Sequence, residues 1–166
     1  MVCPNKKGYT LIELIMVMII AGIISVVFVT RLIGTTSLNQ EIGLSIIRDH
    51  IRYASDYAMA SGIKTVVYFD VLNNTYSLFK EDLSGRTPIE NPEDMQNFVV
   101  DLNDPRFKGL NLTGININGT DEIKFFSYGV PSDANDVKLS AQAFVEINGS
   151  SAITIYPVSG FCKVIP

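Results

Sequence analysis

Glu13 is the side chain whose type and position most clearly indicate chemistry in this sequence. It stands near the start of an apolar segment, and the sixteen residues after it, up to Val29, carry no charge. A carboxylate in lipid costs ~2.5 to 3.5 kcal/mol at a helix centre and less near an end, so we expect a compensating cation. Cleavage after Gly8 would create one, the α-amine of Tyr9, on the same chain or on a neighbouring chain. The alternative is an ordinary signal-anchor helix whose Glu13 reaches the lipid headgroups.

The other residues that could carry chemistry do not form a catalytic set. His50 is the only histidine, which excludes a histidine-based triad and a metal site with several histidine ligands. Because it lies on a predicted helix beside Arg48 and Arg52, we expect it to be a surface or interface residue. The carboxylates are scattered among predicted loops. The sequence therefore predicts a protein that is not an enzyme and has no cofactor.

Residues 133–136 are the segment most able to hold a cation, through the oxygen atoms of Asp133, Asn135 and Asp136. The segment lacks the twelve-residue spacing and closing glutamate of an EF-hand, so no metal site is expected. Four asparagines begin Asn-x-Ser/Thr triplets, and we interpret them as turn residues; they are Asn73, Asn111, Asn118 and Asn148.

Charge and cysteine content narrow the possible partners. The net charge is −4, and loss of Lys6 and Lys7 with a leader leaves 11 of the 13 basic residues against 17 acidic ones, or −6. Nucleic acid is therefore not an expected partner, since phosphate binding needs clustered Lys and Arg. The only cysteines are Cys3 and Cys162. Without the leader, no intrachain disulfide can form.

The apolar segment is long enough for a membrane helix. Its sixteen uncharged residues after Glu13 span ~24 Å at ~1.5 Å per residue, and the apolar residues before Glu13 extend this toward a ~30 Å bilayer core. The sequence from Val27 to Arg31 offers no signal-peptidase site, so removal after the segment is not expected. The two lysines before it favour a cytoplasmic N-terminus. We therefore predict a leader over residues 1–8 and a transmembrane helix over residues 9–33.

The N-terminal sequence resembles the class III signal of type IV prepilins and type II secretion pseudopilins. The resemblance rests on a basic leader ending in glycine, an apolar residue after it and a glutamate five residues after it: Lys6-Lys7-Gly8, then Tyr9-Thr10-Leu11-Ile12-Glu13-Leu14. It implies that a prepilin peptidase cuts between Gly8 and Tyr9 and N-methylates Tyr9. The family usually has phenylalanine in place of Tyr9.

After the apolar segment the sequence pattern predicts one α+β domain over residues 34–166. A helix over residues 38–61 has one apolar face, and Gly62 is a suitable helix stop; the face comprises Leu44, Ile47, Ile51, Ala54 and Ala58. Residues 64–70 and 75–80 form a predicted hairpin. Residues 81–96 are a predicted loop, and further strands are expected at 97–102, 110–118, 122–127, 137–147, 152–156 and 161–165.

This layout resembles the GspH/FimT group of minor pseudopilins and pilins, in which a long N-terminal helix packs on an antiparallel sheet. The resemblance rests on residues 47–62 and on residues 153–160 near the end of the chain. It implies a subunit of a type II secretion pseudopilus, near its tip, anchored in the bacterial inner membrane by a single helix with the domain in the periplasm. The implied partners are other pilin or pseudopilin subunits, the prepilin peptidase, the inner membrane and secreted cargo.

Two other functions stay open from the sequence. One is a minor type IV pilin for pilus assembly or DNA uptake, although Lys163 is the only basic residue near the C-terminus that could serve a DNA-binding patch. The other is a membrane-anchored enzyme, which the absence of a catalytic cluster in the sequence argues against.

Overall fold

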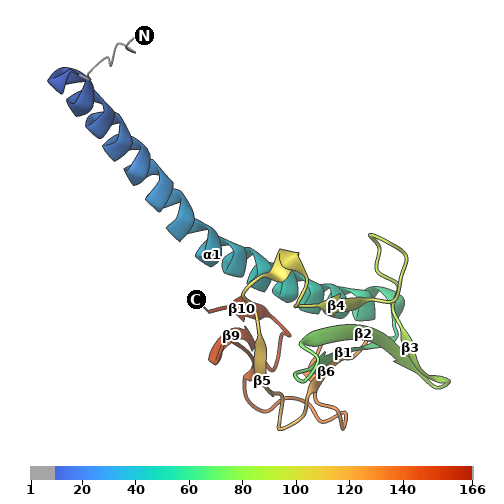
Figure 1. Cartoon of the computed structure of the whole chain (residues 1–166). Coiled ribbons are helices and arrows are strands. Elements are labelled where there is room, and N and C mark those ends of the chain that lie inside the picture. Colours follow the sequence, from blue (N-terminus) through green and yellow to red (C-terminus); the bar gives the residue numbers. More distant parts are fainter. Residues whose placement is uncertain (1–9, 166) are drawn as a thin grey trace. The chain divides into compact units, whose positions relative to one another are not determined.

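The computed structural model describes residues 10–165, without the side chains of residues 26–39 and 151–152. The chain divides into two compact units, Met1–Ser37 and Leu38–Pro166. Helix α1 (Leu11–Ser61) contributes residues to both units (Figure 1). The predicted boundary after residue 33 therefore lies close to the division between the units.

In the second unit, α1 buries the face that its sequence pattern predicts. Ile47, Ile51, Ala54 and Ala58 are fully buried, and Leu44 packs against them half-exposed. The helix ends where Gly62 adopts a φ of +71°, a left-handed conformation that glycine enters without a Cβ penalty. This confirms the predicted apolar face and helix stop.

The first sheet has six strands and is antiparallel throughout. Its path is β3-β2-β1-β6-β7, and β4 pairs with β2 beyond the end of β3. The bounds are β1 (Lys64–Asp70), β2 (Thr75–Asp82), β3 (Gly85–Pro88), β4 (Val99–Asp101), β6 (Glu122–Phe125) and β7 (Pro131–Ser132). The hairpin of β1 and β2 is thus confirmed, and Figure 1 shows β2, β1 and β6 adjacent.

The predicted loop over residues 81–96 is wrong in part. It contains the end of β2 and all of β3. All four residues of β3 are exposed, so the strand shows no alternation of apolar and polar residues and gives no periodic signal. β3 is a strand because it pairs with β2, and this pairing exists only in the folded chain.

The second sheet has four antiparallel strands in the order β10-β9-β8-β5. They are β5 (Leu112–Asn116), β8 (Ala143–Ile147), β9 (Ser150–Ile155) and β10 (Cys162–Val164). The strand predicted over residues 137–147 is wrong in its first half. There the Asp133 carboxylate accepts the amide of Val137, and Asp136 has a φ of +61°, so the chain turns instead of extending.

One hydrophobic core joins the helix and both sheets of the second unit. The largest buried side chains include Phe69, Tyr76 and Phe125. A short 3₁₀ turn, η1 (Pro105–Phe107), inserts Phe107 into this core. The β1–β2 turn is tied to β5 by Asn74, whose Oδ1 accepts the amide of Leu112 at 2.8 Å. Side chains of the domain itself therefore join its helix and its two sheets.

Candidate functional site

The start of α1 places Glu13 in the first helical turn. Its amide donates to the carbonyl of Thr10 at 3.1 Å and to the Thr10 hydroxyl at 3.4 Å. Thr10 to Glu13 is the Thr-x-x-Glu pattern of a capping box, and a carboxylate in the first turn is favoured by the helix dipole. Sequence reasoning missed this cap, although the four-residue pattern was visible. Thr10 therefore caps the helix start through the backbone amide of Glu13, and the Glu13 carboxylate lies in the first turn, where the helix dipole favours a negative charge.

Gly8 and Tyr9, the residues of the predicted processing site, lie outside the described residues. The leader over residues 1–8 lies outside them as well. Cleavage, methylation and the pairing of Glu13 with the Tyr9 amine therefore stay predictions.

The apolar side chains of residues 11–25, in the first unit, are exposed. They include Leu11, which is 78% exposed, as well as Ile15, Met18, Ile20 and Ile24. Within the part of the chain that the structure describes, no helix is both long enough and apolar enough to cross a membrane. The predicted transmembrane helix over 9–33 extends into residues whose side chains are not described.

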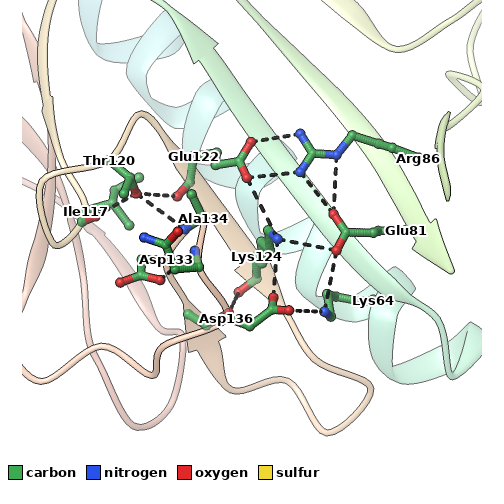
Figure 2. A network of polar contacts seen from close by, with 12 residues as sticks. Lys64, Glu81, Arg86, Ile117, Thr120, Glu122, Lys124, Asp133, Ala134 and Asp136 are labelled. Atoms are coloured by element: carbon green, nitrogen blue, oxygen red, sulfur yellow. Dashed lines mark hydrogen bonds and ion pairs between the residues drawn. The ribbon is translucent and has the colours of Figure 1, made fainter. Parts of the chain in front are cut away.

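A network of ion pairs spans the first sheet, which the sequence reasoning did not foresee (Figure 2). At its centre Lys124 of β6 is only 6% exposed, and its Nζ lies 3.3 Å from Glu81 and 3.3 Å from Asp136. Lys64 Nζ contacts the same two carboxylates, at 3.5 and 2.8 Å. The burial of Lys124 is therefore compensated by acidic groups from β2 and from the loop after β7.

Arg86 anchors the exposed strand β3 to this network. Its guanidinium donates to both oxygens of Glu122, at 2.8 and 3.0 Å, and to Glu81 at 3.0 Å. A two-pronged arginine–carboxylate pair of this kind is stronger and more directional than a single hydrogen bond. No local sequence pattern predicts this pair, because Arg86 and Glu122 are 36 positions apart in the chain.

The network lowers the pKa of two of its carboxyl groups, those of Glu81 and Asp136. Burial alone raises the pKa of Glu81, but hydrogen bonds from Arg86 and Lys124 outweigh it and lower the pKa below the usual 4.5. For Asp136, burial is likewise outweighed by bonds from Lys64 and Lys124, and the pKa falls below 3.8. Both carboxylates are therefore held ionised near neutral pH, as supports of the sheet.

The candidate cation loop uses its oxygens within the protein. Asp133 accepts the amides of Asn135 and Val137 at 2.9 and 3.0 Å, and Asn118 donates to it at 3.2 Å. Asp136 pairs with lysines, as above. Among residues 10–165, no group of three or more His, Cys, Asp or Glu side chains is arranged to hold a metal ion.

His50, expected as a surface or interface residue, is half-buried. Its Nδ1 lies 2.6 Å from the hydroxyl of the buried Tyr76, and its ring centroid lies 4.9 Å from that of Phe98 in a T-shaped arrangement. Burial lowers the pKa of His50, against the opposing fields of Glu93 and Asp49. The helix places His50 toward β4 and β2, because these strands pack beside its face. Its contacts are those of a packing residue.

Cys162 is a free, buried thiol at the start of β10. Burial raises its pKa to about 12, so at neutral pH it is protonated and unreactive. It therefore adds no nucleophile to the domain.

Comparison with known families supports the N-terminal resemblance. Residues 3–29 match the prokaryotic N-terminal methylation motif. That motif indicates membrane anchoring at the N-terminus of a chain with a globular domain. A search of curated protein sequences finds no significant match.

Solved structures of two kinds of pilus-like subunit share the fold. The minor pseudopilin EpsH from the type 2 secretion system of Vibrio cholerae superposes with a TM-score of 0.56 at 13% identity, covering 76% of this chain and 95% of EpsH. A crystal structure of the same pseudopilin gives a TM-score of 0.55 at 14% identity, covering 76% and 93%. The type IV minor pilin FimU of Pseudomonas aeruginosa gives 0.51 at 13% identity, covering 80% and 92%.

The fold is that of a pilin-like α+β protein, an N-terminal helix packed on antiparallel sheets. Together the methylation motif and this fold support a relationship between this chain and the type IV pilin and pseudopilin superfamily.

Proposed function

We propose that this chain is a minor pseudopilin, a structural subunit of a type II secretion pseudopilus near its tip, which has no enzymatic activity. The observation that carries the proposal is the match of residues 3–29 to the methylation motif. The likeness of the domain to a minor pseudopilin adds support at the level of fold. The chain is held in the bacterial inner membrane by its N-terminal helix, with the domain on the periplasmic side.

Processing precedes assembly in this proposal. A prepilin peptidase cuts between Gly8 and Tyr9 and methylates the new amine of Tyr9. The apolar helix stores the subunit in the bilayer until it enters the filament. There Glu13 neutralises the amine of an adjacent subunit, and the exposed apolar side chains of residues 11–25 are covered by neighbouring helices. The domain faces outward and contacts other minor subunits or secreted cargo.

Mass spectrometry of the protein extracted from membranes tests the processing step. The expected N-terminus is a methylated Tyr9 in cells that contain the peptidase, and Gly8→Ala or a bulkier substitution should leave an uncut precursor. An intact Met1 N-terminus, or a cut beyond Val29, would contradict the proposal.

A minor type IV pilin is the second candidate, and the shared fold with FimU favours it. Both candidates use the same processing and the same helix. Deleting the gene and measuring secretion of cargo and pilus number separates them. Loss of secretion with normal pili supports the pseudopilin, and the reverse supports the pilin.

A further inference from the structure

His50 lies where α1 meets β2 and the residues between β3 and β4, which we call the β3–β4 segment (residues 89–98). On its buried side, Nδ1 lies 2.6 Å from the hydroxyl of Tyr76, which is 1% exposed. The ring also packs at right angles to Phe98, the last residue of the segment. Phe98 is stacked in turn on Tyr53 of α1. His50 and Tyr53 therefore hold Phe98 against the helix.

The contact with Tyr76 decides which ring nitrogen of neutral His50 carries the hydrogen. Among the described residues, Nδ1 of His50 is the hydrogen-bond partner found for the Tyr76 hydroxyl. Burial raises the pKa of Tyr76, so the phenol keeps its hydrogen. A buried hydroxyl without an acceptor is costly, so Tyr76 donates, Nδ1 accepts and Nε2 carries the ring hydrogen. A second proton must then enter at Nδ1, where it removes the acceptor of Tyr76.

An acidic cleft of about 430 Å³, a volume greater than that of an imidazole ring, lies beside His50, which is one of its lining residues. Carboxylates reach the cleft from the helix, from the β3–β4 segment, from β4 and from the start of η1. They are Asp49, Glu93, Asp94, Asp101 and Asp104. Arg106 of η1 is the only arginine or lysine among the described residues that line it.

The carboxylates of the acidic cleft differ in how they are paired. Asp49 lies 2.7 Å from Arg48, and Asp104 lies 3.1 Å from Arg106. The other three take part in none of the ion pairs found in the described residues; they are Glu93, Asp94 and Asp101. The cleft therefore favours a cation, whereas the buried position beside Tyr76 disfavours one.

We infer that protonation moves the His50 side chain from Tyr76 into the acidic cleft, and that this releases the β3–β4 segment from α1. In the neutral form, the ring accepts the Tyr76 hydroxyl and supports Phe98. In the protonated form, carboxylates of the cleft stabilise the imidazolium and water takes its place at Tyr76. Phe98 then keeps only Tyr53 as an aromatic neighbour on the helix. This switch is a property of the folded domain and does not depend on the proposed function.

Acidification is the direction that opens this contact. Burial lowers the pKa of His50 below 6.5, against the opposing fields of Glu93 and Asp49 and with the field of Arg106. The buried position is therefore fully stabilising above pH 6.5, and this contribution is lost as the pH falls from 6.5 through the lowered value. The window lies above the unfolded pKa of Glu81, 4.5, so the switch acts before the sheet network is protonated.

Nitrogen NMR of the imidazole tests the protonation step, because His50 is the only histidine and gives one pair of ring signals. The sample is the full chain in detergent without a histidine tag, titrated with acid alone. We expect Nε2 to carry the hydrogen above pH 6.5 and the midpoint to lie below 6.5. In Tyr76→Phe the midpoint should move upward, because protonation no longer removes an acceptor. A hydrogen on Nδ1 in the neutral form, or the same midpoint in both proteins, would overturn the inference.

A pair of charge variants tests the cleft as the site that receives the ring. Glu93→Gln removes a carboxylate from the cleft and should move the midpoint of His50 downward. Glu90→Gln makes the same change in the same segment but outside the cleft lining, and should leave the midpoint near the wild-type value. Equal shifts in the two variants would contradict a role for the cleft.

Hydrogen exchange measures release of the β3–β4 segment. Its amide protection is compared at about pH 7.5 and about pH 5.5 after correction for intrinsic exchange rates. We expect protection to fall several-fold on acidification in the wild type and to stay constant in His50→Gln, which has no imidazole to protonate. The β8–β9 hairpin of the same molecule is the internal control. A fall of equal size in His50→Gln, or in the hairpin, would refute the switch. If His50→Gln does not fold, Glu93→Gln serves instead and should require a lower pH for release; release at the wild-type pH would refute the switch.

Discussion

Two regions of the molecule contain the same kinds of apolar side chain but differ in what covers them. Residues 11–25 of α1 expose their leucines, isoleucines, methionines and valines, whereas Ile47, Ile51 and Ala54, further along the same helix, are fully buried by the two sheets. At ~25 cal/mol per Å², exposed aliphatic side chains in water are unfavourable by ~1.5 to 3 kcal/mol each. The first region therefore requires lipid or other helices to cover it, and the second does not.

The charged groups of the two regions also differ in how they are paired. In the second unit the buried Lys124 is compensated by carboxylates from β2 and the loop after β7. In the first region, Glu13 is exposed at the helix start and is bonded locally through its amide to Thr10. The charges of the sheet network are thus paired within the domain, whereas the Glu13 carboxylate is exposed, as the proposed pairing with an amine requires.

Removing the first region should have the largest effect on behaviour. A chain that lacks residues 1–33 loses the exposed apolar residues but keeps the buried face of α1 with its sheets. We expect a soluble protein with one cooperative unfolding transition, measured by circular dichroism during heating. Aggregation of this fragment, or a transition without cooperativity, would show that the domain depends on the N-terminal helix.

Substitution of Glu13 tests whether its carboxylate serves a partner or only the helix cap. Glu13→Leu should keep membrane insertion and cleavage, but incorporation into filaments should fail, because an uncompensated buried amine costs ~3 to 5 kcal/mol. Glu41→Leu, the same change elsewhere on α1, is the control.

Glu13→Gln separates the charge of this residue from its place in the Thr-x-x-Glu pattern. Glutamine can still act in a capping box but carries no charge. Co-purification of each variant with sheared filaments is the measurement. Wild-type incorporation of Glu13→Gln would mean that the cap suffices and that pairing with the amine is wrong.

Loss of the buried cation should destabilise the domain by a smaller amount. Lys124→Ala leaves Glu81, Glu122 and Asp136 facing one another with Lys64 and Arg86 only, and we expect a loss of about 3 kcal/mol in the free energy of unfolding. Denaturant titration of the full chain in detergent measures it. The exposed Lys163 provides the control, since Lys163→Ala should change stability by less than about 0.5 kcal/mol. Similar losses in both variants would argue against the network as a support.

Acid should produce the smallest effect, and its sign follows from the lowered pKa values of Glu81 and Asp136. A carboxyl group with a lower pKa in the folded state contributes stability that is fully present above its unfolded pKa, 4.5 for Glu81 and 3.8 for Asp136. That contribution is lost as the pH falls through the lower folded values. Stability should therefore decline below about pH 4.5, and Glu81→Gln should make the decline shallower. An unchanged slope in this variant would contradict the assignment.

Local signals in the sequence were sufficient for a large part of the fold. The apolar face of α1, its end at Gly62 and the β1–β2 hairpin are all determined by neighbours a few positions apart. The N-terminal motif belongs to this class as well, because residues 3–29 match the methylation motif through their linear sequence.

The tertiary structure decided the features that depend on distant partners. Strand β3 exists through its pairing with β2, the first half of the predicted strand 137–147 turns because Asp133 captures the amide of Val137, and His50 is half-buried because Tyr76 and Phe98 lie beside it. The pairing of Lys124 and Arg86 with three carboxylates also appears only when β2, β3 and β6 are adjacent. The spacing of apolar residues in the sequence predicts which face of a helix or strand is apolar. The partner of a buried charge is determined instead by strand order and register, which local residues do not encode.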